Sequence, residues 1–108
     1  MRRTKREILT TALFHLDKVE QHAAHGLTEE LVIDACALRL IAMLDPLSAL
    51  PHASLTTLFP ENWALMRDMR NRLVHGYATV DTCVIEVTIR AELPHLRRVI
   101  ERELALDN

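Results

Sequence analysis

The sequence predicts an all-α protein, a four- to five-helix antiparallel bundle, and three observations support this prediction. Apolar residues make up 49% of the chain but aromatic residues only 4%, so the core must consist mainly of aliphatic side chains. Two glycines and four prolines interrupt 108 residues, and so few helix breakers favour long helices over short strands. Apolar residues also recur every three or four positions along most of the chain. We expect one domain, residues 1–108.

The first predicted helix spans about residues 5–25, and Gly26 is expected to end it in a left-handed conformation. Its apolar face comprises Ile8, Ala12, Leu16, Val19 and Ala23. Histidines and acids on the same helix raise the possibility of a metal site, but no open three-ligand spacing is present, so a solvated face is the better interpretation. These residues are His15, Asp17, Glu20, His22 and His25.

The second predicted helix begins after Thr28, whose hydroxyl is expected to cap it, and Pro46 should kink or end it. It is apolar on two faces, one with Leu31, Ala35, Leu38 and Ala42, the other with Ile33, Ala37, Leu40 and Leu44. Such a helix is covered on both faces, so it is either the central helix of the bundle or part of an interface. Charged residues such as Asp34 and Arg39 argue against a membrane span.

Residues 51–60 lack a helical pattern and are predicted to form a loop, with Pro60 as the first residue of a third helix. That helix carries a stripe at spacings of three and four, formed by Trp63, Met66, Arg70, Leu73 and Tyr77. Gly76 is expected to weaken or end it.

Asp81 is predicted to cap the last helix, and Pro94 to make it either one kinked helix or two short ones. Its apolar stripe comprises Ile85, Ile89, Leu93, Leu96, Ile100 and Leu104. On the opposite side, a solvated face is expected from Arg97, Arg98 and Arg102.

Charge and cysteine content restrict the function classes. The net charge of −2 argues against a general nucleic-acid coat, although a local basic groove is compatible with it. The basic residues gather in two groups, Arg2, Arg3, Lys5 and Arg6, and Arg67, Arg70 and Arg72. Cys36 and Cys83 form no C-x-x-C pair, and no apolar signal-peptide core follows the basic start, so we expect a cytoplasmic protein with two buried thiols.

The best functional candidate is the polar cluster within residues 67–81. Arginine suits phosphate, and histidine can act as base or acid near neutral pH. Arg70 and His75 lie five residues apart, about 140° on an ideal helix, so they cannot share a face. They can cooperate only if the helix breaks near Gly76 or if a second subunit contributes. Asn71 lies four residues before His75 and is placed to orient its imidazole.

Together, an arginine and a histidine suffice for RNA cleavage without a metal. His75 would take the proton from a ribose 2′-hydroxyl, and Arg70 would stabilise the charge on the phosphorane-like transition state. A histidine from a symmetry mate would protonate the leaving oxygen. On spacing alone, a structural histidine among surface arginines is the stronger interpretation.

The segment from Met69 to Tyr77 resembles the R-x-x-x-x-H-x-Y signature of the HepT-like branch of the HEPN (higher eukaryotes and prokaryotes nucleotide-binding) proteins. Arg70, Asn71, His75 and Tyr77 match it in order and spacing. Weaker matches flank it: Trp63, Val80-Asp81, Glu92-Leu93-Pro94, residues 26–30 and Asp34.

This resemblance implies a homodimeric helical bundle with both Arg-His pairs in one cleft, acting as a metal-independent endoribonuclease toxin without a cofactor. It also implies a partner, a minimal nucleotidyltransferase antitoxin of the MntA type, which transfers AMP to Tyr77. A phosphodiester on this phenol would repel RNA from the cleft.

The chain departs from the family pattern at Asp45-Pro46, at Ala78 after the motif tyrosine, and near Ile85 and Glu86. Asp45 either pairs with Arg70 or Arg72, as a carboxylate in an apolar helix requires, or has only a helix-end role. These departures favour an alternative, in which the bundle is a non-enzymatic nucleotide- or substrate-binding subunit of a nucleotidyltransferase. A purely structural helical dimer would leave the polar cluster unexplained.

Overall fold

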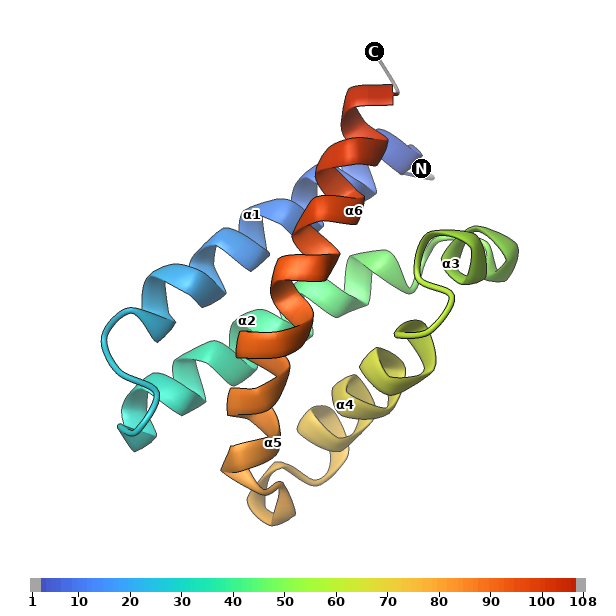
Figure 1. The fold of residues 1–108 in the computed structure, drawn as a ribbon. Helices are drawn as coiled ribbons and strands as arrows, with labels where there is room; N and C mark the ends of the chain where they lie inside the picture. The colour runs from blue at the N-terminus through green and yellow to red at the C-terminus, as the bar shows by residue number, and fades with distance from the viewer. Residues whose placement is uncertain (1–2, 107–108) are drawn as a thin grey trace.

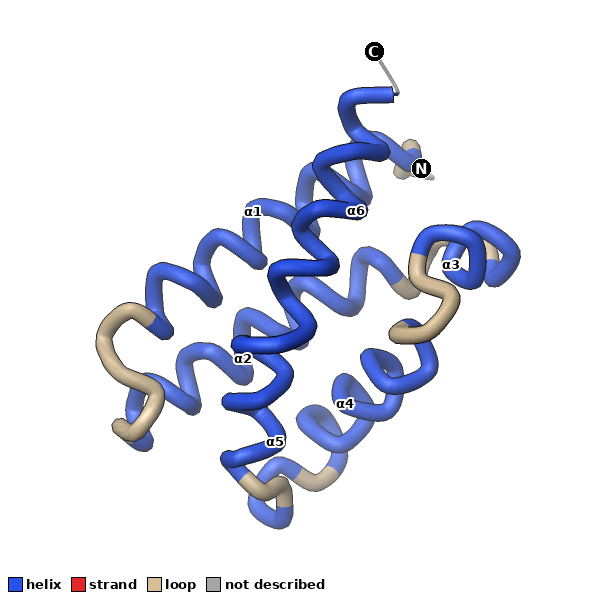
Figure 2. Tube along the Cα trace, viewed as in Figure 1, coloured by secondary structure: helices blue, strands red, loops and turns tan. Residues whose placement is uncertain are grey.

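The computed structural model describes residues 3–106, which are helical apart from short connections, so Arg2 lies outside the described residues. The elements are α1 (Lys5–Ala23), α2 (Glu30–Leu47), α3 (His52–Leu58), α4 (Trp63–His75), the 3-10 turn η1 (Tyr77–Thr79), α5 (Thr82–Val87), the π-helical segment η2 (Thr88–Glu92) and α6 (Leu93–Leu106). No strand occurs in this part of the chain (Figure 2). Because α5, η2 and α6 form one continuous helix, residues 3–106 form a five-helix assembly, and the predicted all-α bundle is confirmed (Figure 1).

α1 and α2 lie side by side as a hairpin, and the long α5–α6 helix crosses them (Figure 1). The predicted face of α1 is buried at Ile8, Ala12, Leu16 and Val19, and the helix ends at Ala23, two residues before its predicted end. Gly26 has a φ of 114°, the positive value predicted for it. Positive φ is unfavourable for residues with a Cβ, so this turn requires glycine.

The start of α2 differs from the prediction. Glu29 occupies the N-cap position and no side chain caps the helix, so Thr28 is not the cap. The reason is the preceding turn, in which the Glu29 amide donates to the Gly26 carbonyl and delays the first helical residue to Glu30. At the other end, α2 stops at Leu47, one residue after Pro46.

Only one of the two apolar faces of α2 is buried within the chain. Ile33, Ala37, Leu40 and Leu44 lie in the core, whereas Leu31 is 80% exposed and Leu38 66% exposed. The expectation that both faces are covered is therefore wrong for the single chain. An interface on the second face stays a prediction.

The predicted loop over residues 51–60 is instead the two-turn helix α3. Leu55 and Phe59 lie four positions apart and are both buried, so burial of this pair stabilises a helix that composition does not indicate. Pro60 is not the first residue of α4 because residues 60–62 form a turn and the helix begins at Trp63.

The last helix confirms most of its prediction. The Asp81 carboxylate accepts a hydrogen bond of 2.9 Å from the Cys83 amide and caps α5. Ile85, Ile89 and the rest of the apolar stripe face the core, with Leu104 at its partly buried end. Pro94 has no N–H for the preceding turn, and the wider π-helical turn at η2 lies directly before it. The helix therefore continues through Pro94 rather than splitting in two.

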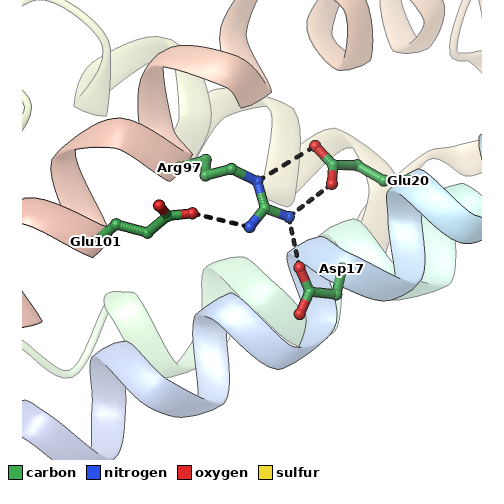
Figure 3. Close-up of polar contacts among 4 residues, drawn as sticks. All are labelled: Asp17, Glu20, Arg97 and Glu101. Carbon is green, nitrogen blue, oxygen red and sulfur yellow. Dashed lines mark hydrogen bonds and ion pairs between the residues drawn. The ribbon is translucent and has the colours of Figure 1, made fainter.

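Two predictions about surface residues are wrong. Cys83 is exposed, whereas Cys36 is buried as expected, and both thiols are free. Arg97 is not part of a solvated face, because it joins α6 to α1 through the carboxylates of Asp17 and Glu20 (Figure 3). Its Nη2 lies 2.6 Å from Glu20 Oε1, and its Nη1 lies 3.0 Å from Glu101 on its own helix. These bonds, the one to Asp17 first, raise the pKa of Arg97.

Candidate functional site

The predicted site residues lie on the second half of α4 and on the turn that follows it. α4 buries Trp63, Met66, Met69 and Leu73, which fixes the direction of the polar side chains between them. The helix ends where Gly76 was expected to end it, and the Gly76 amide donates to the Arg72 carbonyl at 2.8 Å. The break therefore follows His75 and separates it from Tyr77, the first residue of η1.

Arg70 is held by an acid from α2. Its Nε donates to Asp45 Oδ1 at 2.7 Å, and its Nη1 donates to Asn71 Oδ1 at 3.2 Å. The structure thus selects Arg70 over Arg72 as the partner of Asp45. Within the described residues, Nη2 of Arg70 has no hydrogen-bond partner, and the side chain is 31% exposed. A guanidinium held on one edge and open on the other is suited to a phosphate oxygen.

His75 is not brought to Arg70. Both belong to the unbroken helix Trp63–His75, so their directions differ by about 140°. His75 is exposed on the last turn of α4. The amide oxygen of Asn71 accepts a hydrogen bond from Arg70, and no hydrogen bond joins Asn71 to His75 in the described part of the chain. A single chain therefore presents the arginine and the histidine in different directions.

Tyr77, like Arg70, forms a polar contact with an acid of α2. It is half-buried, and its phenolic O–H donates to the carboxylate of Asp34 on α2. Partial burial and then this hydrogen bond raise the pKa of Tyr77 to about 12. Beside the phenol lies an open pocket of about 590 Å³, whose polar lining is Thr28, Glu30, Asp34, Tyr77, Thr82, Cys83 and Glu86.

Neither of these contacts follows from local sequence pattern. Asp45 and Arg70 are separated by 25 positions, and Asp34 and Tyr77 by 43. Both acids lie on the exposed side of α2, eleven positions apart, close to three helical turns, and α2 packs against α4. One stripe of α2 therefore supplies a carboxylate to each of the two motif residues.

A second groove lies between α4 and the α5–η2 segment, with a volume of about 430 Å³. Its lining is mostly apolar, including Leu65, Met66, Val84 and Val87, and the arginine at its edge is Arg72. Among residues 3–106, no group of three or more His, Cys, Asp or Glu side chains is arranged to hold a metal ion. No helix in the same range is long and apolar enough to cross a membrane.

Comparison with known families bears directly on this segment. Residues 52–103 match the family model described as "Ribonuclease HepT-like". This region runs from the start of α3 into α6 and contains Arg70, Asn71, His75 and Tyr77. Neither the comparison with curated proteins nor that with solved structures found a match. Residues 52–103, just under half of the chain, are therefore similar to the HepT-like ribonuclease family.

Proposed function

We propose that the protein is the toxin of a toxin–antitoxin system, an endoribonuclease that cleaves RNA without a metal ion. The family match supports ribonuclease activity, and it covers the whole motif from Arg70 to Tyr77. The observation that carries the proposal is the guanidinium of Arg70, which Asp45 holds while Nη2 stays open. This is the arrangement that a phosphate-binding residue needs.

In the proposed reaction, His75 removes the proton from a ribose 2′-hydroxyl. The 2′-oxygen forms a bond to the adjacent phosphorus, and the bond from phosphorus to the 5′-oxygen breaks. The products are a 2′,3′-cyclic phosphate and a 5′-hydroxyl, whose proton comes from a second histidine. Arg70 stabilises the additional negative charge on the phosphate oxygens in the transition state.

This chemistry requires two subunits. Because Arg70 and His75 point about 140° apart on one helix, a complete site would combine Arg70 of one protomer with the partner subunit's His75. A two-fold interface is self-complementary, so it would create two such pairs in one cleft. The exposed Leu31 and Leu38 lie on the stripe of α2 that also carries Asp34 and Asp45, and they supply apolar area for this interface.

Regulation by a nucleotidyltransferase antitoxin belongs to the same proposal. Transfer of AMP to Tyr77 would place a phosphodiester anion two residues from His75. Like charges repel, so the modified tyrosine would weaken RNA binding at the adjacent cleft. RNA and the antitoxin would thus be the two partners of the homodimer in the cytoplasm.

The test is RNA cleavage by purified protein in excess chelator. RNA cleavage by His75→Ala and by Arg70→Ala should each be about 100-fold or more slower than by wild type. His75→Ala removes the proton acceptor, and Arg70→Ala removes the positive charge that stabilises the transition state. His52→Ala removes an exposed histidine on α3 and should retain wild-type activity. Refolding the two inactive variants together should restore part of the cleavage rate, since a mixed dimer contains one complete Arg70–His75 pair but lacks the second histidine.

Two results would contradict the proposal. Wild-type protein that leaves RNA intact would exclude the ribonuclease, and mixed variants that stay inactive would exclude a site shared between subunits. RNA binding without cleavage products would favour the second candidate, a non-enzymatic binding subunit of a nucleotidyltransferase. The observation that favours this second candidate is the separation of Arg70 from His75 in the single chain.

A further inference from the structure

The contact between Tyr77 and Asp34 suggests chemistry beyond side-chain packing. Asp34 is an exposed residue of α2, and the phenol that it meets belongs to the turn after α4. The hydrogen bond has the phenol as donor and the carboxylate as acceptor. A carboxylate in this position already holds the proton that must leave if the phenol oxygen becomes a nucleophile.

We infer that Asp34 is the proton acceptor for nucleotide transfer to Tyr77, an inference that rests on the proposed modification of this tyrosine. The phenol oxygen attacks the α-phosphorus of a nucleoside triphosphate held by the antitoxin. A bond forms between that oxygen and the α-phosphorus, and the bond from the α-phosphorus to the bridging oxygen breaks, releasing pyrophosphate. The phenolic proton passes to the Asp34 carboxylate and then to water.

Proton acceptance is useful here because the phenol is a poor acid. Its pKa of about 12 leaves very little phenolate at neutral pH. As the bond to phosphorus forms, the oxygen becomes far less basic, so the proton can pass to a carboxylate within the same step. Phosphoryl transfer to hydroxyl groups in protein kinases uses an aspartate in the same way.

Other acids near the phenol lack this contact. Glu30 lies one turn before Asp34 on α2 and acts on Tyr77 only through its charge. Glu86 lines the same pocket from α5, and no hydrogen bond joins it to Tyr77 in the described part of the chain. The open pocket of about 590 Å³ leaves the phenol accessible from solvent, as attack by an external enzyme requires.

The experiment measures label transfer from ATP carrying a radioactive α-phosphate, with a purified minimal nucleotidyltransferase of the MntA type. Asp34→Asn keeps the size of the side chain but is a far weaker proton acceptor, and should lower the initial rate about 100-fold. Asp34→Glu restores the carboxylate and should recover part of the rate. Glu30→Gln is the matched control and should stay within about threefold of wild type, and Tyr77→Phe should take no label.

Two further measurements separate proton transfer from a structural role. RNA cleavage by Asp34→Asn should fall much less than nucleotide transfer does, because no hydrogen bond joins Asp34 to Arg70 or His75 in the described residues. The deficit of Asp34→Asn should also shrink as the pH rises, since the phenolate fraction grows about tenfold per pH unit below the pKa of the phenol.

The outcomes distinguish the inference from the function on which it rests. If wild type takes no label, the proposed modification fails and the inference fails with it. If wild type and Asp34→Asn are labelled at the same rate while Tyr77→Phe is not, Tyr77 is the modified residue and the inference alone is wrong. A deficit of Asp34→Asn that is the same at every pH would also overturn it.

Discussion

At the residue scale, Asp45 determines how Arg70 is presented. The pair is half-exposed, with side-chain exposures of 31% for Arg70 and 48% for Asp45. Ion pairs with this exposure contribute little to stability, because water screens the charges and two side chains must be ordered. The value of the contact is therefore in orienting the guanidinium.

Asp45→Asn tests whether the ion pair with Arg70 orients the guanidinium rather than stabilising the fold. Its free energy of unfolding should fall by less than about 1 kcal/mol, whereas RNA cleavage should fall about tenfold because the guanidinium loses its fixed direction. Urea unfolding and cleavage assays measure the two effects. Asp68→Asn, which changes an exposed acid on α4, should alter neither quantity. A large loss of stability in Asp45→Asn would mean that the ion pair is structural.

Tyr77 is the only tyrosine of the chain, so its titration can be followed without interference from other phenols. Burial and the bond to Asp34 raise its pKa to about 12, above the value of about 10 for an unfolded chain. The folded protein therefore keeps the proton at higher pH. The corresponding stability is fully present below about pH 10 and is lost as the pH rises towards 12.

The expected result is a phenolate absorbance midpoint near 12 for wild type and a lower one for Asp34→Asn. Circular dichroism at each pH shows whether the helices persist. A wild-type midpoint at about 10 in a protein that is still helical would contradict the contact with Asp34.

At the element scale, the two glycines of the chain have different physical roles. Gly26 lies within the α1–α2 connection at a φ of 114°, and apart from its chain neighbours no heavy atom is within 4 Å of the place where a Cβ would stand. Gly76 follows α4 with a φ of −156°, which any residue adopts. A Cβ there would lie 3.3 Å from Thr79 Oγ1, a side chain able to shift by a few tenths of an ångström.

Comparing Gly26→Ala with Gly76→Ala therefore separates two effects of an added Cβ: backbone strain at a positive φ, and steric contact with neighbouring atoms. Gly26→Ala should lower the free energy of unfolding by about 1–2 kcal/mol, entirely through its backbone conformation. Gly76→Ala should cost less than about 1 kcal/mol and leave α4 ending at the same place. Chemical denaturation of both variants measures the difference, and equal losses would refute it.

The elements also show where sequence patterns mislead. α3 was predicted to be a loop because its seven residues, His-Ala-Ser-Leu-Thr-Thr-Leu, carry too few apolar positions for a periodic signal. Burial of Leu55 and Phe59 against the rest of the chain stabilises it. Segments this short depend on tertiary packing, because a helix of a few turns is not stable alone.

At the scale of the whole molecule, Arg97 is one of the polar connections between the first and the last helix (Figure 3), as is the pair Lys5–Glu103. It meets residues 80 and 77 positions earlier in the chain, Asp17 and Glu20. The guanidinium is 27% exposed and neutralises acids that would otherwise repel each other. This network fixes the position of α6 across α1.

Arg97→Ala should therefore lower the free energy of unfolding by about 1–2 kcal/mol, more at low salt than at high salt. Arg90→Ala provides the matched control, because among residues 3–106 Arg90 pairs only with Glu86 on its own helix, at 3.7 Å, and is 65% exposed. The free energy of unfolding of Arg90→Ala should fall by less than about 0.5 kcal/mol. Thermal or urea unfolding of both variants makes the comparison, and similar losses would show that the network contributes no more than an isolated surface pair.

By itself, the sequence determined the helical class, the buried stripes of the first and last helices, the cap at Asp81, the end of α4 at Gly76 and the motif from Arg70 to Tyr77. All of these depend on residue type and on spacings of a few positions, which helix geometry converts directly into faces and ends. The sequence also determined the direction of His75 relative to Arg70, because a separation of five residues on one helix sets the angle between the two side chains.

Only the tertiary structure decided which acids meet the motif. The sequence left Arg70 and Arg72 open as partners of Asp45 and did not connect Asp34 with Tyr77 at all. These contacts depend on how α2 packs beside α4 and η1, and that arrangement depends on side-chain packing throughout the core rather than on any local pattern. For the same reason, the ion pairs of Arg97 and the helical conformation of α3 could not be predicted from local sequence and depend on how the helices pack.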